Sequence, residues 1–223
     1  MLHGEVSLRD LIERYCEHVE GPRIGTAPVV RRGHHLPASY LDVLHVANGF
    51  VSNRKAFRLF GIDTQVPALD LHLWNKSSWV AEYGDLAANL VFIAEDIFGD
   101  QYGLRFAQGT DQNPVLVKFC CEGGETEVIE AESLAAWLTG SVLREEPTPL
   151  DWDLATAAFA RGLMPSEAEH LSFSLPLVAG GNAEESNLEV MDRVFHLHLL
   201  GQLSLRNRHL PEGAKIDRFC PES

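Results

Sequence analysis

The sequence predicts an α+β fold, with a mostly antiparallel central sheet and helices packed on one side of it. Period-two apolar alternation occupies the middle of the chain, helical apolar spacing occurs on both sides of it, and no internal repeat or low-complexity tract stands out. A length of 223 residues suits one large domain or a domain with an extension. The proline-containing acidic stretch at residues 145–149 is the best boundary, so we expect a domain at 1–146 and an extension at 147–223 packed on it.

The N-terminal part predicts two helices. Ser7 is suited to cap the first, with Asp10 in its first turn, and apolar residues continue at helical spacing to Val19. A Gly-Pro pair follows and is expected to end this helix. The second helix is expected to begin at Pro37 and to end near Asn48, which precedes a glycine.

The centre of the chain predicts the core of the sheet. Residues 57–62 form a short strand candidate, whereas residues 69–83 fit either an alternating strand or a helix. Residues 90–94 form an apolar run typical of a strand covered on both faces, and a turn at Gly99 and Asp100 leads into an alternating return strand. Further strands are predicted at 113–121 and 126–129, and a helix at 132–143.

The C-terminal part is harder to assign. Asp151 is suited to cap a helix, and residues 171–178 contain a proline that favours an edge strand or irregular structure. Gly180 and the glycine after it fit a flexible turn, because no phosphate-binding signature follows them. Residues 188–205 fit both a strand period and a helix period, and the sequence leaves both open.

The charge of the chain restricts its partners. A net charge of −14 argues against direct binding of nucleic acid, because phosphate contacts need clustered Lys and Arg. It is compatible with a basic protein partner, or with solubility alone. The first residues lack a signal-peptide pattern, no apolar run is long enough for a bilayer, and four cysteines do not form a secreted framework. We therefore expect a cytoplasmic protein without a membrane partner.

Two groups of residues could carry chemistry. Glu95, Asp96 and Asp100 could share a proton or a hard metal ion, but they lack EF-hand spacing and an accompanying nucleophile. The simpler interpretation is that Asp100 holds the turn while the other two carboxylates are solvated. His196 and His198 would share a face on a strand and diverge on a helix. We predict no catalytic residue, no metal and no cofactor, and hence no enzyme.

The residues around the turn also carry a family resemblance. The run Phe-Gly-Asp-Gln-Tyr-Gly at 98–103, after an apolar strand, resembles the central motif of the SUKH superfamily. Matches in the expected order lie upstream, at Leu36-Pro37, Tyr40, Leu44, Asn48-Gly49, Phe60-Gly61, Trp74-Asn75 and Trp79. The resemblance covers residues 7–140 and implies a SUKH-like fold. That superfamily includes a yeast cell-wall-assembly regulator and bacterial immunity proteins that neutralise polymorphic toxins.

The resemblance implies a non-enzymatic binding protein, a bacterial immunity protein that blocks a cognate nuclease-type toxin by occlusion. The alternative is a regulatory or scaffold protein of the yeast type, without a toxin partner. Because two acidic stretches contain no Lys or Arg, we expect them to dock a basic toxin domain. The predicted docking residues are Glu82, Asp85, Glu95, Asp96, Glu122, Glu125 and Glu127, and the predicted structural residues are Gly99, Asp100 and Trp74.

Overall fold

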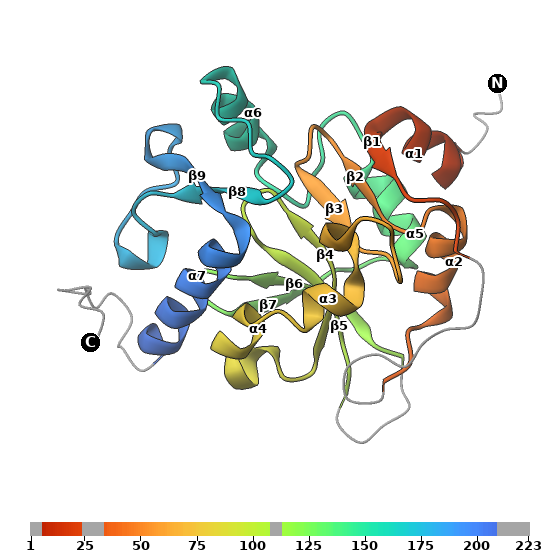
Figure 1. Cartoon of the computed structure of the whole chain (residues 1–223), viewed down its shortest axis with the longest axis horizontal. Coiled ribbons are helices and arrows are strands. Elements are labelled where there is room, and N and C mark those ends of the chain that lie inside the picture. Colours follow the sequence, from red (N-terminus) through yellow and green to blue (C-terminus); the bar gives the residue numbers. More distant parts are fainter. Residues whose placement is uncertain (1–5, 24–33, 108–112, 209–223) are drawn as a thin grey trace.

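The computed structural model describes residues 6–23, 34–107 and 113–208, so the end of the predicted extension lies outside the described residues. Its centre is a seven-stranded antiparallel sheet in the order β1-β2-β3-β4-β5-β6-β7 (Figure 1). These strands are β1 (Cys16–Val19), β2 (Phe50–Ser52), β3 (Phe57–Leu59), β4 (Leu90–Asp96), β5 (Gln101–Arg105), β6 (Val115–Cys120) and β7 (Glu125–Val128). A second, two-stranded sheet pairs β8 (Glu169–Phe173) with β9 (Leu188–Asp192). The predicted α+β class with an antiparallel sheet is confirmed.

The α-helices lie around this sheet. They are α1 (Leu8–Tyr15), α2 (Ala38–Val46), α3 (Leu71–Asn75), α4 (Trp79–Glu82), α5 (Leu134–Trp137), α6 (Trp152–Ala160) and α7 (Arg193–Asn207). Short helical turns are η2 (Pro67–Leu69), η3 (Gly84–Ala87), η4 (Leu138–Val142), η5 (Leu177–Ala179) and η6 (Glu185–Asn187). In the described residues, no helix has the length and apolar character needed to cross a membrane.

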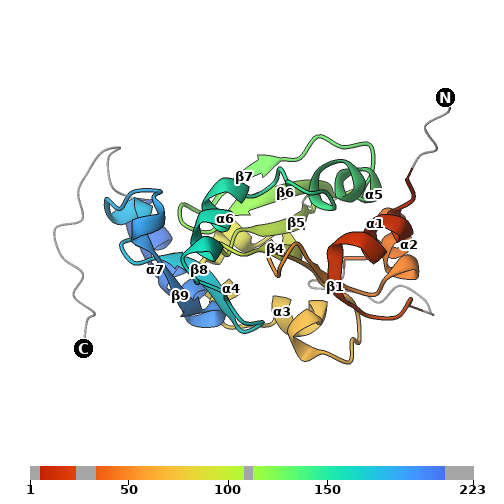
Figure 2. The same ribbon diagram turned by 90° about the horizontal axis from the view of Figure 1, so that it is seen from above.

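Helices cover both faces of the sheet, not one face as the sequence predicts (Figure 2). On one face, Trp137 of α5 packs against Phe57 and Tyr102, with ring centroids 5.7 Å and 5.2 Å away. On the other face, Trp79 of α4 packs against Phe92 of β4 at 5.3 Å. The apolar run of β4 is consequently buried on both sides, and all seven of its residues are buried.

The first helix is shorter than the sequence predicts. Ser7 and Asp10 form the expected capping box, in which the Ser7 hydroxyl accepts from the Asp10 N–H and the Asp10 carboxylate accepts from the Ser7 N–H. The helix nevertheless ends at Tyr15, and the chain continues as β1 because Cys16 and Val19 pair with β2. Strand pairing therefore overrides the helical apolar spacing of these residues.

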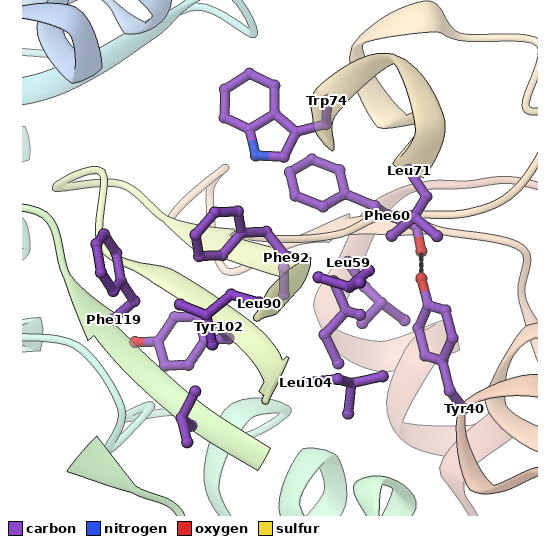
Figure 3. Packing of buried hydrophobic residues seen from close by; sticks show 14 of the residues in the cluster. Tyr40, Leu59, Phe60, Leu71, Trp74, Leu90, Phe92, Tyr102, Leu104 and Phe119 are labelled. Carbon is purple, nitrogen blue, oxygen red and sulfur yellow. Dashed lines mark hydrogen bonds between the residues drawn. The ribbon is translucent and has the colours of Figure 1, made fainter. Parts of the chain in front are cut away.

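Aromatic side chains form much of the core (Figure 3). The Tyr40 hydroxyl donates to the carbonyl oxygen of Phe60, which ties α2 to the end of β3. The Trp74 ring packs at a tilt against the rings of Phe60 and Trp79, with centroids 5.3 Å and 5.4 Å away. Burial of each large apolar side chain contributes roughly 1.5–3 kcal/mol. Trp74 therefore lies in the core.

The structure resolves the segments that the sequence leaves open. Residues 69–83 contain the two short helices α3 and α4, and residues 188–205 divide into β9 followed by α7. Asp192 separates them, because its carboxylate accepts from the Phe195 N–H as an N-cap. The C-terminal elements contact the large sheet and its helices, mainly where α7 packs on α4 (Figure 1).

Candidate functional site

The end of β4 places two carboxylates on opposite faces of the sheet. Glu95 and Asp96 are successive strand residues, so their side chains point in opposite directions. Both are buried. The prediction that they belong to an exposed docking surface is therefore wrong, and so is the interpretation that they are solvated.

Glu95 is the centre of a buried charge network. Its Oε1 accepts from Nη1 of Arg58 at 2.8 Å and from Nη1 of Arg193 at 2.9 Å. Arg58 lies on β3, whereas Arg193 is the first residue of α7 and stacks over the Trp74 ring at 4.1 Å. Burial alone would raise the pKa of Glu95. Arg193, His170 and Arg58 outweigh burial and hold this pKa well below its usual range. Glu95 is therefore an ionised bridge between the central sheet and α7.

Two buried histidines adjoin this network. Nε2 of His170 lies 3.4 Å from the second oxygen of Glu95, and its Nδ1 lies 3.3 Å from Nδ1 of His196. Burial lowers the pKa of His170, and burial together with His170 lowers the pKa of His196 to about 3. Both rings are therefore neutral at physiological pH, so one Nδ1 donates and the other accepts. Gly99 fits beneath them, since a Cβ at that position would lie 3.1 Å from His170.

Asp96 organises the turn on the other face. Its Oδ1 accepts from the N–H groups of Phe98 and Asp100, at 3.0 Å and 3.2 Å. Its Oδ2 lies 2.9 Å from the Tyr102 hydroxyl and 4.0 Å from Nζ of Lys118. The structure thus assigns to Asp96 the role that the sequence gives to Asp100.

Asp100 instead ties the turn to the neighbouring strand. One of its oxygens accepts from the Cys121 N–H at 3.0 Å, and the other lies 2.9 Å from Nζ of Lys118. Burial and the charge of Asp100 raise the pKa of Asp96 to about 7, although Lys118 and the hydrogen bonds oppose this rise. Asp100 therefore joins the β4–β5 turn to the residue after β6 and to Lys118, through contacts different from those expected.

The Tyr102 hydroxyl has two possible acceptors and one proton. It lies 2.9 Å from Asp96 and 2.9 Å from the carbonyl oxygen of Pro149, which Lys118 also approaches at 3.2 Å. When Asp96 is ionised, the Tyr102 hydroxyl donates to Asp96, and Lys118 donates to the carbonyl oxygen of Pro149. When Asp96 is protonated, it donates to Tyr102, which in turn donates to Pro149. Both protonation states are satisfied without movement of the backbone.

These buried groups fit a structural role better than a catalytic one. Each carboxylate oxygen of Glu95 and Asp96 has a protein partner, and neither residue lines the cavities of about 500 and 610 Å³ that adjoin β7 and α1. The sequence interpretation missed the residues that contact the two buried carboxylates. These are Arg58, Arg193, His170, Tyr102 and Lys118. The only local signal for Arg58 is a charge inside an apolar strand segment.

The histidine pair diverges because it lies on α7. His196 points to His170, whereas Nδ1 of His198 lies 3.1 Å from the Glu82 carboxylate. Of the two alternatives that the sequence leaves open, the helical one applies, and the two side chains do not share a face. Within the described ranges, no group of three or more His, Cys, Asp or Glu side chains could hold a metal ion.

His198 also joins Glu82 to a serine. Its Nε2 lies 2.9 Å from Oγ of Ser78, so the contacts follow the serine–histidine–carboxylate order of hydrolytic triads. Ser78 is exposed and lines neither the cavity beside β7 nor the one beside α1. We interpret this chain of contacts as a link between α4 and α7.

The remaining predicted docking residues lie nearer the surface. Asp85, Glu125 and Glu127 are exposed, whereas Glu82 is partly buried by its contact with His198. Glu122 accepts from the Leu177 N–H at 3.0 Å, and burial raises its pKa. Glu122 therefore holds η5 against the β6–β7 turn. Of the predicted docking residues, only Asp85, Glu125 and Glu127 are exposed.

Comparisons with known proteins agree with the resemblance found in the sequence. The model of the SMI1 / KNR4 family (SUKH-1) matches residues 31–140. The chain is also similar to the crystal structure of Atu4351 from Agrobacterium tumefaciens, with 14% identity, a TM-score of 0.52 and 86% of each chain covered. This likeness shows the fold alone. No curated protein matches the chain.

Proposed function

Because this chain belongs to the SUKH superfamily, we propose that it is an immunity protein that neutralises a cognate nuclease toxin without doing chemistry. The family supports an immunity role or a role like that of SMI1/KNR4. Members of this family are generally non-enzymatic. The identity of the partner and the occlusion mechanism are our proposals.

The acidic exposed surface is the observation that carries the choice of partner. The chain has a net charge of −14, and neither residues 79–101 nor residues 122–143 contain Lys or Arg. Asp85, Glu125 and Glu127 from these stretches are exposed. A nuclease must present basic side chains to phosphates, so an acidic protein can compete for the same surface.

The internal carboxylates support a binding role. Glu95 and Asp96 are both buried and hydrogen-bonded within the protein, which leaves them no open position for a substrate. They stabilise the fold from which the exposed acids project. Binding through preformed acidic surfaces needs no conformational change in this protein.

The test is co-expression with the product of the neighbouring open reading frame. The proposal predicts restored growth and a complex whose association slows as ionic strength rises. Absence of both binding and rescue would contradict the immunity role and favour the regulatory alternative. Rescue with salt-independent association would support immunity but contradict the electrostatic mechanism.

A further inference from the structure

Strand β7 leaves one side of its backbone open. It is the last strand of the large sheet and pairs with β6 alone (Figure 2). The Ile129 N–H donates to the carbonyl oxygen of Leu116 at 3.0 Å, so the alternating ladder directs Glu127 and Glu125 toward β6 as well. The N–H and C=O groups of Thr126 and Val128 therefore point away from β6. Nothing in the described part of the chain bonds to them.

The opposite edge is less suited to receive a strand. Strand β1 contains a register shift between Cys16 and His18, where a bulge interrupts its ladder with β2. Such bulges protect an edge from further pairing. Strand β7 has four successive partners on β6 without a shift, from Val117↔Val128 to Cys120↔Glu125. The regular edge is therefore the one at β7.

The charges on β7 indicate which kind of strand could pair with its open edge. Glu125 and Glu127 are exposed on the strand, and Glu130 and Glu132 are exposed just beyond it. A second copy of β7 would bring carboxylates against carboxylates, which is unfavourable across a strand pair. A strand carrying Lys or Arg at alternate positions would instead meet opposite charge. The edge consequently fits a basic segment better than another copy of this chain.

A cavity at the end of the same strand adds an apolar contact. It has a volume of about 500 Å³ and is lined by Val115, Val128 and Ile129, together with the first residues of α2 and α5. Val115 and Val128 are 41% and 49% exposed. A side chain from a strand placed along β7 could enter this cavity and cover both valines.

We propose that a basic β-strand of the toxin adds to β7, with its backbone bonded to Thr126 and Val128 and its cations facing Glu125 and Glu127. This inference rests on the proposed function and specifies which surface and which kind of segment form the complex. Backbone bonds along the edge supply affinity, and the carboxylates supply the preference for a basic partner.

The first test compares Val128→Pro with Val128→Ala, using the toxin domain encoded by the neighbouring gene as the probe. Both variants lose the valine side chain, but only proline removes the outward N–H. That N–H is not part of the β6 ladder, so both variants should fold. We expect Val128→Pro to bind roughly 2- to 10-fold more weakly than Val128→Ala, as the loss of one backbone bond requires. Equal affinities of the two variants would overturn the inference.

The second test reverses charge at two places. Glu125→Lys with Glu127→Lys should slow association, whereas Glu145→Lys with Glu146→Lys makes the same charge change elsewhere. Glu145 and Glu146 are exposed and follow Arg144, whose carbonyl oxygen accepts from Asn53 between β2 and β3. Equal slowing by both double variants would indicate net charge alone and contradict the role of β7.

Hydrogen exchange distinguishes the remaining outcomes. The amides of Thr126 and Val128 should exchange rapidly in the free protein and become protected in the complex. Binding without this protection would overturn the inference while leaving the proposed function intact. Protection already present in the free protein would mean that this chain or a second copy covers the edge, which also overturns it. No binding at all would overturn the proposed function together with the inference.

Discussion

Replacement of Glu95 by glutamine tests the buried network most sharply. The substitution keeps the shape of the side chain but removes the only carboxylate within hydrogen-bonding distance of both Arg58 and Arg193 among the described residues. Two buried guanidinium groups then share a neutral acceptor. Breaking a buried pair in this way costs about 3–5 kcal/mol, because the partner charge stays desolvated. Each lost charge-assisted bond accounts for about 1.5–3 kcal/mol, which gives a similar total.

The assay is urea unfolding followed by tryptophan fluorescence. With a urea m-value of about 2–3 kcal/mol per molar, a loss of this size lowers the midpoint by about 1–2 M. The control is Glu127→Gln, which removes an exposed carboxylate and should change the free energy of unfolding by less than about 0.5 kcal/mol. A loss below about 1 kcal/mol for Glu95→Gln would refute the reasoning.

A double variant separates the pair from its surroundings. Glu95→Gln combined with Arg193→Met removes one of the two uncompensated charges. We expect the double variant to lose less stability than the sum of the single variants, by about 1 kcal/mol or more. Simple additivity would show that Glu95 and Arg193 do not act together.

Three further predictions concern the β4–β5 turn. Because the folded state raises the pKa of Asp96 from 3.8 to about 7, native protein binds the proton more tightly, so stability should fall as pH rises from about 4 to about 7. Asp96→Asn should flatten this decline in urea unfolding measured across that range, and an unchanged slope would contradict the assignment. Asp100→Ala should cost about 1–3 kcal/mol, since the Cys121 N–H loses its acceptor, and an unchanged melting temperature would contradict it. Gly99→Ala should cost about 1–3 kcal/mol because Gly99 has φ +91° and faces His170; Gly140→Ala, with nothing within 4 Å, is the control in thermal unfolding.

The apolar strand and turn were predictable because their signals are local. The alternating residues of β5 and the Gly99-Asp100 turn need no distant partner to be recognised. The surroundings of Glu95 were not predictable in this way. Arg58 and Arg193 lie 37 and 98 positions from Glu95 in the sequence. Without knowledge of these partners, a carboxylate that follows an apolar run is typical of a solvent-exposed loop. The strand instead continues through Asp96, because Arg58 and Arg193 compensate the charge of Glu95. Asp96 is held by hydrogen bonds from the Phe98 N–H and the Tyr102 hydroxyl.

Helix and strand periods conflict where tertiary pairing decides the outcome. Cys16 and Val19 fit the face of the first helix, yet they pair with β2. At residues 188–207 the deciding signal was present in the sequence. Asp192 is a residue type favoured as an N-cap, and it marks the boundary between β9 and α7. The spacing of apolar residues does not by itself separate the strand from the helix.

Competition for nucleic acid is the measurement that tests the central claim most directly. The nuclease activity of the neighbouring gene product would be titrated with this protein, while binding of a labelled duplex to the same toxin is followed. Occlusion predicts that activity and duplex binding fall together and reach their minimum at one equivalent per toxin. A saturated complex that still binds or cleaves the duplex would contradict the account.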